Sequence, residues 1–229
     1  MKNLAVIIGR EGSKRIKNKN FKKFYGKSIV EWSINVAEKT NLFDKIIFST
    51  DKDQKKIKSK KIKDYIYFKR PKKYSGDNAS TIIAVNHSIN WIKDNFTAPK
   101  YVCCIYACSP LIIYNDIINA YKILKSNKWN YVFSATNYNY PLERSFKINN
   151  DKSIKMNFPT NYSKKTQLFK TNYHDAGQFY WGKIDSWLNN KKFFDTNSTA
   201  YLIPSERVQD IDSLENWRNA EKIFKNLRK

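Results

Sequence analysis

The sequence predicts an α/β protein built on a doubly wound, mostly parallel β-sheet. Up to residue 135, short runs of apolar and β-branched residues alternate with segments whose apolar residues recur every three or four positions. Runs of the first kind are typical of buried strands, and segments of the second kind are typical of amphipathic helices. Strands and helices that alternate in this way form βαβ units, which require a parallel sheet.

The expected elements follow one another regularly along the chain. Strands are predicted at 4–8, 45–49, 65–68, 101–107 and 131–135. Helices are predicted between them, at 28–40, in a lysine-rich segment around Ile57 and Ile62, from Ser80 or Thr81 onward, and at 116–124. A last strand is expected at 201–204. A closing helix from Ser213 is expected to bury five apolar residues: Leu214, Trp217, Ile223, Phe224 and Leu227.

The alternation fails between residues 136 and 175. This segment is polar, contains Pro141 and Pro159, and is too long for an ordinary connection in a compact domain. We expect a single domain over residues 1–229, in which 136–175 is an inserted arm. Such an arm would cover the site as a lid or reach a second subunit.

The charge of the chain comes mostly from lysine. The net charge is +23, and of the 43 basic residues only 7 are arginine. The lysines are scattered along the chain, whereas base recognition and bidentate phosphate contacts favour arginine. We therefore interpret most of the charge as solvated surface and expect no nucleic acid as the main partner.

The cysteines and the apolar runs indicate a cytoplasmic protein. Cys103, Cys104 and Cys108 lie in one apolar segment and lack the paired spacing of a zinc site, which favours free thiols in a reducing compartment. No apolar run approaches 18 residues, and the N-terminus lacks the pattern of a signal peptide. No membrane segment is expected.

The loop after the first strand is a candidate phosphate site. It begins at Gly9, closes on Asn20 and carries a glycine, a serine and several cations: Arg10, Gly12, Ser13, Lys14, Arg15, Lys17 and Lys19. Glycine lets backbone N–H groups point at an anion, and the cations neutralise its charge. The spacing matches neither a Walker A loop nor a dinucleotide fingerprint. A triphosphate site and a solvated basic loop both remain open.

Two carboxylates near the C-terminus could bind a metal. Asp210 and Asp212 flank Ile211 just before the closing helix, and residues two apart in an extended segment project to the same side. Such a pair suits Mg²⁺, which takes one or two carboxylates together with substrate phosphates. The alternative is that Asp212 begins the helix and Asp210 is solvated.

Three further polar groups have a functional and a structural interpretation. Arg70, together with the polar stretch 77–80, could recognise a base or ribose, or could supply turn and cap contacts. Arg144 could bind a carboxylate, or could form a surface ion pair. His174 and Asp175 could be a general base and its partner, or His174 could be structural.

Taken in order, these motifs resemble those of the sugar cytidylyltransferases that make CMP-activated nine-carbon acids. The resemblance covers essentially the whole chain and rests on four stretches: 9–14 followed by Lys19-Asn20, Arg70-Pro71 followed by 77–80, Ser109-Pro110-Leu111, and 209–212 followed by Trp217 and Ala220-Glu221. The runs 144–146 and 173–181 most resemble the pseudaminic acid branch of this family rather than its neuraminic acid branch.

The resemblance implies a Rossmann-like nucleotidyltransferase and the reaction CTP + pseudaminate → CMP-pseudaminate + pyrophosphate. The anomeric hydroxyl of the sugar acid would attack the α-phosphate in line with the leaving pyrophosphate, a reaction that needs positioning and charge neutralisation. A neuraminate or legionaminate substrate is the first alternative, and an inactive nucleotide- or nucleic-acid-binding homologue is the second. The 136–175 arm would form a homodimer with shared sites.

The resemblance also implies roles for individual residues. Those implied at the nucleotide are Ile8, Gly9, Arg10, Gly12, Ser13, Lys14, Asn20, Arg70, Ala79 and Ser80. Those implied in catalysis are Arg10, Lys19, Asp210 and Asp212, of which the two aspartates would hold Mg²⁺. Those implied at the sugar are Tyr106, Ser109, Arg144, His174, Asp175 and Gln178.

Three positions depart from the pattern that the resemblance leads us to expect. Gly9 stands where the signature has alanine, and Tyr106 stands where the neuraminic acid enzymes are expected to have glutamine. Glu11 places a carboxylate in a loop meant for phosphates. Glu11 must therefore point away from the nucleotide, help to position Mg²⁺, or weaken CTP binding.

Overall fold

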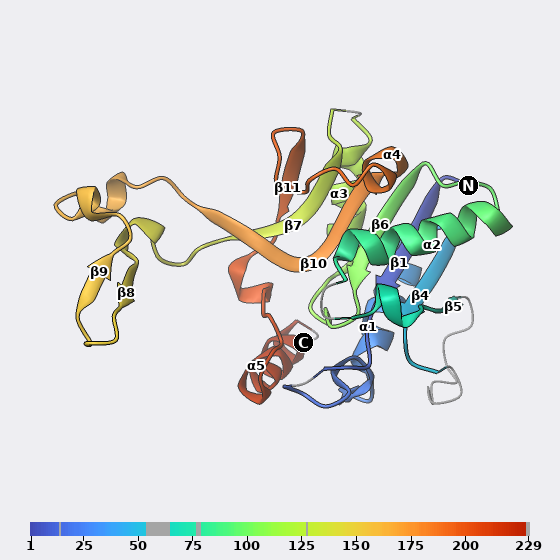
Figure 1. The fold of residues 1–229 in the computed structure, drawn as a ribbon, viewed down its shortest axis with the longest axis horizontal. Coiled ribbons are helices and arrows are strands. Elements are labelled where there is room, and N and C mark those ends of the chain that lie inside the picture. The colour runs from blue at the N-terminus through green and yellow to red at the C-terminus, as the bar shows by residue number, and fades with distance from the viewer. Residues whose placement is uncertain (14, 54–64, 77–78, 127, 228–229) are drawn as a thin grey trace.

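The structure is a computed structural model that describes residues 1–13, 15–53, 65–76, 79–126 and 128–227. Its centre is a seven-stranded sheet with helices on both faces (Figure 1). From one edge to the other the strands are β11 (Ser198–Leu202), β7 (Tyr131–Asn137), β10 (Tyr173–Lys183), β6 (Tyr101–Tyr106), β1 (Asn3–Ile8), β4 (Lys45–Thr50) and β5 (Ile66–Lys69). All neighbours are parallel except β10, which runs antiparallel to both β6 and β7. The predicted fold class is confirmed.

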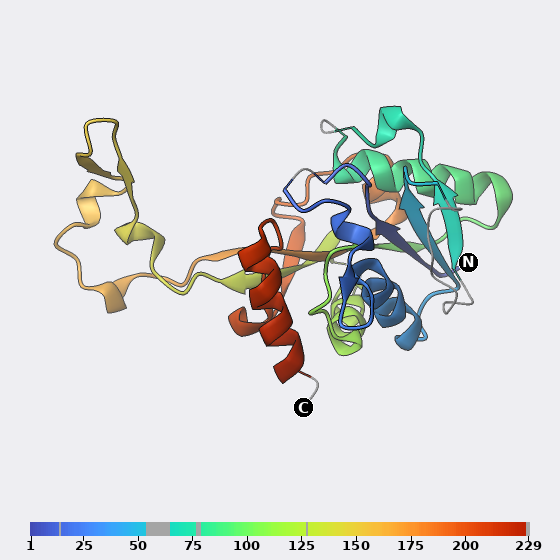
Figure 2. The same cartoon turned by 90° about the horizontal axis from the view of Figure 1, so that it is seen from below.

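Alternate residues of the strands supply two separate cores. In β1, Ala5 and Ile7 pack in one apolar cluster, and Leu4 and Val6 pack in another. The first cluster is covered by α1 (Ile29–Lys39) and α3 (Tyr114–Leu124), and the second by α2 (Thr81–Asn95) and α4 (Ile184–Leu188). Figure 2 shows the two layers from the edge of the sheet, with α2 on one side and α1 and α3 on the other. Because both faces of these strands are buried, their sequences are continuous apolar runs.

The helix starts follow the capping residues in the sequence. Ser28 precedes α1, and its backbone N–H donates to Glu31 Oε2 at 2.6 Å in a capping box. Ser80, rather than Thr81, caps α2 by accepting a hydrogen bond from the backbone N–H of Ile83.

Several expected boundaries are wrong. Helix α3 begins at Tyr114 instead of residue 116, and the last strand is 198–202 instead of 201–204 because β11 pairs with β7 over those residues. Leu214 and Leu227 are exposed, since they lie off the face of the last helix that Trp217 and Phe224 bury. The expected lysine-rich helix with Ile57 and Ile62 lies outside the described residues.

The order of the strands sets the place of the site. The chain passes from β1 outward to β4 and β5 and then crosses to β6, which lies on the other side of β1. A crevice opens at such a reversal, beyond the carboxyl ends of the two strands. Ile8, the last residue of β1, pairs with Ser49 of β4 and Tyr106 of β6 at this edge. Because β10 runs the other way, its first residues reach the same edge.

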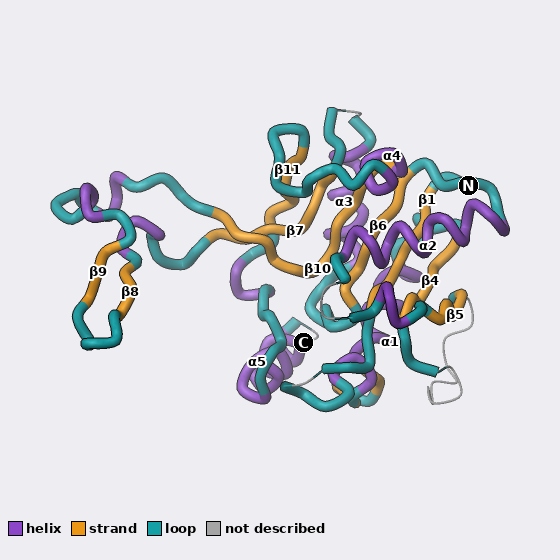
Figure 3. The backbone as a smooth tube through the Cα atoms, viewed as in Figure 1, coloured by secondary structure: helices purple, strands orange, loops and turns teal. Residues whose placement is uncertain are grey.

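The segment between β7 and β10 projects away from the sheet (Figures 1 and 3). It carries a small hairpin of β8 (Phe146–Ile148) and β9 (Ile154–Met156), and three short 3₁₀ turns: η4 (Leu142–Arg144), η5 (Pro159–Asn161) and η6 (Thr166–Leu168). Several of its large apolar side chains are exposed, namely Tyr140, Ile148, Ile154, Tyr162 and Leu168. The expected bounds of 136–175 include the end of β7 and the start of β10, so we call residues 138–172 the arm.

A third apolar cluster joins the last helix to the loop after β1. Its buried members are Ile16, Phe24, Ile29, Leu111, Ile211, Trp217, Ala220 and Phe224. Helix α5 (Leu214–Asn226) supplies the last three of these residues. The small hairpin of β2 (Lys23–Phe24) and β3 (Lys27–Ser28) supplies Phe24. The short turn η1 (Lys19–Phe21) follows Ile16, and the short turn η7 (Ser205–Arg207) precedes Ile211. The basic loop and residues 209–212 therefore share one packed core. No described helix is long and apolar enough to span a membrane.

Candidate active site

A cleft of about 470 Å³ opens beyond the carboxyl ends of β1 and β6. It lies at the reversal of the strand order, where an open α/β sheet binds its ligands. Three stretches form its walls: the loop after β1, the segment between η3 (Lys72–Tyr74) and α2, and the loop after β6. Asp210 and Asp212 complete the lining from the C-terminal side.

The loop after β1 is fixed by close backbone packing. The N–H of Gly9 donates to the carbonyl of Ser49 at 3.1 Å. A Cβ atom at Gly9 would lie 2.8 Å from the Cβ of Ala107, so the loops after β1 and β6 touch at this point. Asn20 Nδ2 donates to the carbonyl of Arg10 at 2.9 Å and closes the loop. Glycine at position 9 is therefore required by the approach of the second loop.

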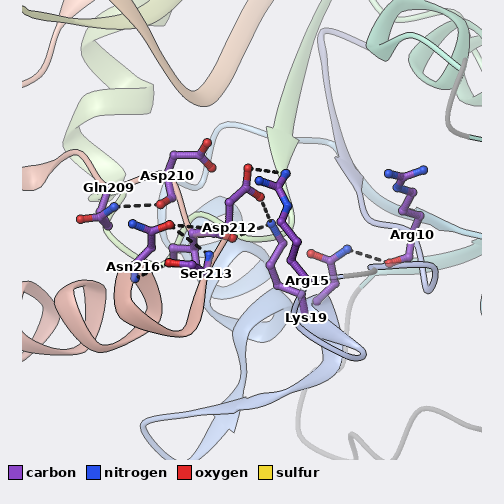
Figure 4. A network of polar contacts seen from close by, with 10 residues as sticks. Arg10, Arg15, Lys19, Gln209, Asp210, Asp212, Ser213 and Asn216 are labelled. Atoms are coloured by element: carbon purple, nitrogen blue, oxygen red, sulfur yellow. Dashed lines mark hydrogen bonds and ion pairs between the residues drawn. The ribbon is translucent and has the colours of Figure 1, made fainter. Parts of the chain in front are cut away.

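Two cations of this loop hold Asp212 (Figure 4). Lys19 Nζ lies 3.0 Å from Asp212 Oδ1 and also donates to the carbonyl of Ile211 at 2.6 Å. Arg15 reaches the other carboxylate oxygen, with 2.7 Å between its guanidinium nitrogen and Asp212 Oδ2. Lys19 is a predicted site residue, and Arg15 is one of the cations of the predicted phosphate loop.

The two aspartates differ in their electrostatic surroundings. The pKa of Asp210 lies above its usual value, because its place in the cleft removes part of its hydration and the Asp212 carboxylate repels its charge. The pKa of Asp212 lies below its usual value: partial burial would raise it, but contacts with Lys19 and Arg15 outweigh that effect. Asp210 therefore carries a negative charge that its neighbours compensate poorly.

The pair fits a hard divalent cation of the Mg²⁺ type. Asp210 and Asp212 offer carboxylate oxygens beside a cleft rich in cations, and Mg²⁺ takes one or two carboxylates plus phosphate oxygens and water. The excess negative charge around Asp210 is the kind of charge that a cation relieves. Within the described part of the chain no group of three or more His, Cys, Asp or Glu side chains could form an all-protein metal cage. A metal here would need ligands from its substrate.

Arg70 lies in the opposite wall of the cleft and is only 5% exposed. Its Nε donates to Ser75 Oγ at 3.0 Å, and one terminal nitrogen reaches the carbonyl and hydroxyl of Ser49 at 3.3 Å. Burial lowers its pKa, an effect that Asp51 opposes. A guanidinium has five donors in a fixed fork, so Arg70 is held rigidly and can direct further donors into the cleft.

Glu11 points away from the cleft. Its carboxylate lies 3.2 Å from Lys52 Nζ, and its backbone N–H donates to Asp51 Oδ1 at 2.8 Å. Lys52 is buried and also lies over the ring of Phe21. Of the three possibilities raised for Glu11, the geometry agrees with the first.

A second pocket of about 310 Å³ adjoins the cleft. Its lining comes from the loop after β6, the first half of β10 and the segment before α5: Tyr106, Cys108, Ser109, Pro110, Leu111, Asp175, Ala176, Gly177, Gln178, Gln209 and Asp210. Four residues, Tyr106, Cys108, Gly177 and Asp210, line both spaces. No lysine or arginine is among the described residues that line this second pocket.

Hydrogen bonds fix the polar groups of the second pocket. The hydroxyl of Tyr180 donates to Asp175 Oδ2, and the N–H of Gly177, at φ +61°, donates to Asp175 Oδ1 at 2.8 Å. The Tyr106 hydroxyl lies 2.7 Å from Thr81 Oγ1, and burial raises the pKa of Tyr106 to about 12. The phenol therefore stays protonated near neutral pH and acts through hydrogen bonds.

The side-chain amide of Gln178 is held by a hydrogen bond to the backbone. Its Nε2 donates to the carbonyl of Arg207 at 3.1 Å, and Arg207 makes a bidentate ion pair with buried Asp116 at 2.7 and 3.1 Å. A carbonyl can only accept, so the orientation of the Gln178 amide is set. Among the described residues, its buried Oε1 has no hydrogen-bond partner.

The structure brings most of the expected site residues together. Those that line the cleft are Ile8, Gly9, Arg10, Ser13, Lys19, Asn20, Arg70, Ala79, Ser80, Tyr106, Asp210 and Asp212, and those that line the second pocket include Ser109, Asp175 and Gln178. Gly12, Arg144 and His174 are not among the lining residues of either space, and Lys14, Asp77 and Asn78 lie outside the described part of the chain.

Arg144 and His174 have other contacts. Arg144 donates to the carbonyls of Tyr162 and Lys164 within the arm and lies 5.7 Å from the ring of Phe169. His174 Nδ1 lies 2.9 Å from the carbonyl oxygen of Asp175, and its ring packs against Tyr138. Within one chain, the contacts of both side chains are therefore local.

Several lining residues are not among those predicted for the site. They include Tyr74, Ser75, Thr81, Cys108, Gly177 and Gln209. Cys108 is the second residue after β6, as Arg10 is the second residue after β1, so its position just beyond a central strand was the available signal. Burial raises the pKa of Cys108 to about 12, which keeps it a thiol and not a thiolate nucleophile near neutral pH.

A cleft at the strand reversal, lined by cations and closed by two aspartates, defines a nucleotide-binding α/β protein, and the comparisons with known proteins identify its family. The family model for cytidylyltransferases matches residues 4–194, and the chain belongs to that family. It is therefore a nucleotidyltransferase.

Among curated proteins, the chain is 34% identical to the pseudaminic acid cytidylyltransferase of Campylobacter jejuni strain 81-176, over 98% of this chain and 97% of that protein. It is 28% identical to the N-acylneuraminate cytidylyltransferase of Escherichia coli O18:K1:H7, over 91% of this chain and 49% of that protein. Among solved structures, a CMP:2-keto-3-deoxy-manno-octonic acid synthetase in complex with CTP covers 99% of this chain and all of the other, with a TM-score of 0.70 and 11% identity. That likeness concerns the fold.

Proposed function

We propose that the protein transfers CMP from CTP to pseudaminate, forming CMP-pseudaminate and pyrophosphate. The name of the relative with 34% identity supports this substrate. The structural observation that carries the proposal is the position of Asp210, which lines both the cleft and the second pocket. In a transfer between two substrates, the reacting phosphorus and the attacking hydroxyl must meet at such a junction.

The cleft would bind CTP. Arg10, Ser13 and Lys19 lie on the loop after β1 and would contact the triphosphate, with Lys14 as a further expected contact from the same loop. Arg70, Ala79 and Ser80 lie across the cleft and would contact the cytidine, together with Asn20. The rigid hold on Arg70 through Ser75 and Ser49 supports this orientation, because a fixed donor discriminates between ligands better than a mobile one.

The second pocket would bind the sugar acid. Asp175, Gln178 and the Tyr106 hydroxyl present hydrogen-bonding groups that suit a hydroxylated and amidated sugar. The anomeric hydroxyl would then approach the α-phosphorus from the Asp210 side, opposite the departing pyrophosphate. The work of the protein is to hold the two substrates in line and to neutralise the charge that develops.

We propose Mg²⁺ as the cofactor, held by Asp210 and Asp212 together with phosphate oxygens of CTP. When bound, Mg²⁺ supplies Lewis acidity at the α-phosphate and neutralises charge on the leaving pyrophosphate. Lys19 supports the same region, since its ammonium group lies 3.0 Å from Asp212 Oδ1 and at the edge of the cleft. The side chain of Lys19 is 18% exposed, so its charge acts in a partly dehydrated setting.

We also propose that the protein is a homodimer joined through the arm. The arm exposes Tyr140, Ile148, Ile154, Tyr162 and Leu168, side chains that a second copy would cover. The second pocket supports the same conclusion, because no lysine or arginine of the described chain lines it, although a sugar acid brings a carboxylate. The arm, which carries Arg144, would bring a cation to the partner's pocket.

The reaction belongs in the cytoplasm, where CTP is available, and the three free cysteines agree with a reducing compartment.

The proposal is tested by measuring pyrophosphate release from CTP and Mg²⁺ with pseudaminic, legionaminic and N-acetylneuraminic acid supplied separately. Release with pseudaminic acid alone is the expected result. Release only with another of the acids would keep the reaction and overturn the substrate. No release with any acid, from folded protein, would overturn the activity itself.

A further inference from the structure

Arg15, on the loop after β1, forms an ion pair with one of the two aspartates of the proposed metal site. Its side chain is 71% exposed, yet its guanidinium lies 2.7 Å from Asp212 Oδ2. Lys19 approaches the other oxygen of the same carboxylate at 3.0 Å. One carboxylate is thus shared by two cations that come from the loop after β1, and all three side chains line the cleft (Figure 4).

This arrangement opposes the binding of a third cation. A divalent metal at Asp212 would be repelled by the guanidinium and the ammonium group already in contact with that carboxylate. Each oxygen of that carboxylate already accepts one contact, so a metal would have to share the oxygen atom with a bound cation. The nearby charge of Asp210 attracts a metal, but one carboxylate alone holds Mg²⁺ weakly because that ion loses its water reluctantly.

A triphosphate in the cleft changes this balance. Arginine and lysine both bind phosphate, and arginine binds it bidentately. A nucleotide would therefore offer Arg15 and Lys19 several anionic oxygens in place of the single carboxylate. Asp212 would then be released to face the metal.

We propose that Arg15 and Lys19 are exchangeable counter-ions of Asp212, which leave its carboxylate for the phosphates of the nucleotide and so make metal binding depend on the nucleotide. This inference rests on the proposed function, because it takes CTP as the ligand of the cleft and Asp210 with Asp212 as the metal site. By linkage, the metal must in turn strengthen nucleotide binding.

The test uses Mn²⁺ as the probe and the nucleotide-free protein. Electron paramagnetic resonance of unbound Mn²⁺ gives the affinity directly. Arg15→Gln is expected to bind Mn²⁺ about two- to fivefold more tightly than the wild type, the size of effect set by an exposed ion pair. Lys17→Gln is the matched control, because it removes an exposed cation from the same loop that lines neither pocket. It should leave the Mn²⁺ affinity nearly unchanged.

A second measurement follows the other half of the exchange. Calorimetric titration of CTP in the presence of EDTA should show weaker binding to Arg15→Gln and unchanged binding to Lys17→Gln. Equal Mn²⁺ affinity in the wild type and Arg15→Gln, or an equal gain in both variants, would overturn the inference. The inference would also be overturned if, in EDTA, Arg15→Gln bound CTP as tightly as the wild type does.

The inference and the proposed function fail separately. Turnover of CTP by the wild type, combined with no Mn²⁺ effect in Arg15→Gln, would overturn the inference and keep the function. The expected Mn²⁺ effect without turnover of any sugar acid would overturn the function and keep the pairing of Arg15 with Asp212.

Discussion

The cleft and the second pocket are neighbours of unlike character. The cleft contains cations from separate parts of the chain, among them Arg10, Lys19 and Arg70, and hydrogen bonds hold several of its groups in place. The second pocket has acceptors such as Asp175 and Gln178, and the described residues around it include no lysine or arginine. If the cleft binds CTP and the second pocket binds the sugar acid, as proposed, one chain supplies many cations for the first ligand and none of its described lysines or arginines for the second.

This contrast suggests that the affinity for CTP and the affinity for the sugar acid have different origins. Binding in the cleft should depend on residues of one chain, whereas binding in the second pocket should depend on a second copy as well. Each of the following variants alters the cleft, the second pocket, the arm, or the junction between the cleft and the pocket.

The largest effect is expected at the junction. Asp210→Asn removes a charge from the proposed metal site while keeping the shape of the side chain, and turnover should fall at least about 100-fold, as for other losses of electrostatic stabilisation in a transition state. Steady-state pyrophosphate release measures the loss. Glu206→Gln, an exposed carboxyl on the same segment that lines neither pocket, should retain activity. Full activity of Asp210→Asn would exclude it as a metal ligand.

The next largest effect is expected in the arm. Ile148 is 70% exposed, and Ile148→Glu should weaken dimer formation because it places a charge on the apolar surface. The KM for the sugar acid should then rise about tenfold or more, the loss expected for one charge-assisted contact, while the Kd for CTP stays constant. Light scattering and kinetics at several protein concentrations measure both. Ile148→Val is the control, and a fully active Ile148→Glu monomer would contradict the shared site.

A smaller effect is expected inside the second pocket. Asp175→Asn keeps an oxygen for the N–H of Gly177 but removes the negative charge. The KM for the sugar acid should rise about three- to tenfold, in line with the loss of one hydrogen bond to a charged group. The KM for CTP should not change. A matching rise in both KM values would mean that the two spaces are not separate binding sites.

The smallest effect is expected at Glu11. Its carboxylate pairs with Lys52 outside the cleft, so Glu11→Gln should leave the Kd for CTP within about twofold and lower the free energy of unfolding by about 1 kcal/mol or less. Calorimetry with CTP and chemical denaturation measure the two quantities. A marked gain in CTP affinity would show that Glu11 does oppose the nucleotide.

The sequence was most informative where burial alone determines structure. The central strands have apolar residues on both faces, so their runs mark them without ambiguity, and Ser28 and Ser80 mark helix starts through their own hydrogen bonds. It was less informative at the edge of the sheet. The bounds of β11 follow from its pairing with β7, and the sequence of β11 alone does not indicate which strand it pairs with.

The candidate site shows the same division. Residues that directly follow a strand or stand in a motif could be identified, as Gly9, Arg70 and Asp210 show. Arg15 could not be singled out among its basic neighbours, because its role depends on a contact with Asp212, almost two hundred positions further along the chain. The exposure of Leu214 was also unpredictable, since the apolar content of a helix does not say where its partner surface ends.

The contact between Gly9 and Ala107 has a consequence for how this site can be altered. With only 2.8 Å between the Cβ of Ala107 and a Cβ placed at Gly9, the two positions behave as a single choice of side chain. An alanine at position 9 needs position 107 to give up its methyl group or its loop to move, and Asn20 and Phe48, each 3.3 Å from that Cβ, to shift slightly. The order in which such changes are made therefore decides whether an intermediate carries this clash, so loops exchanged with relatives in chimaeras should be exchanged as a pair.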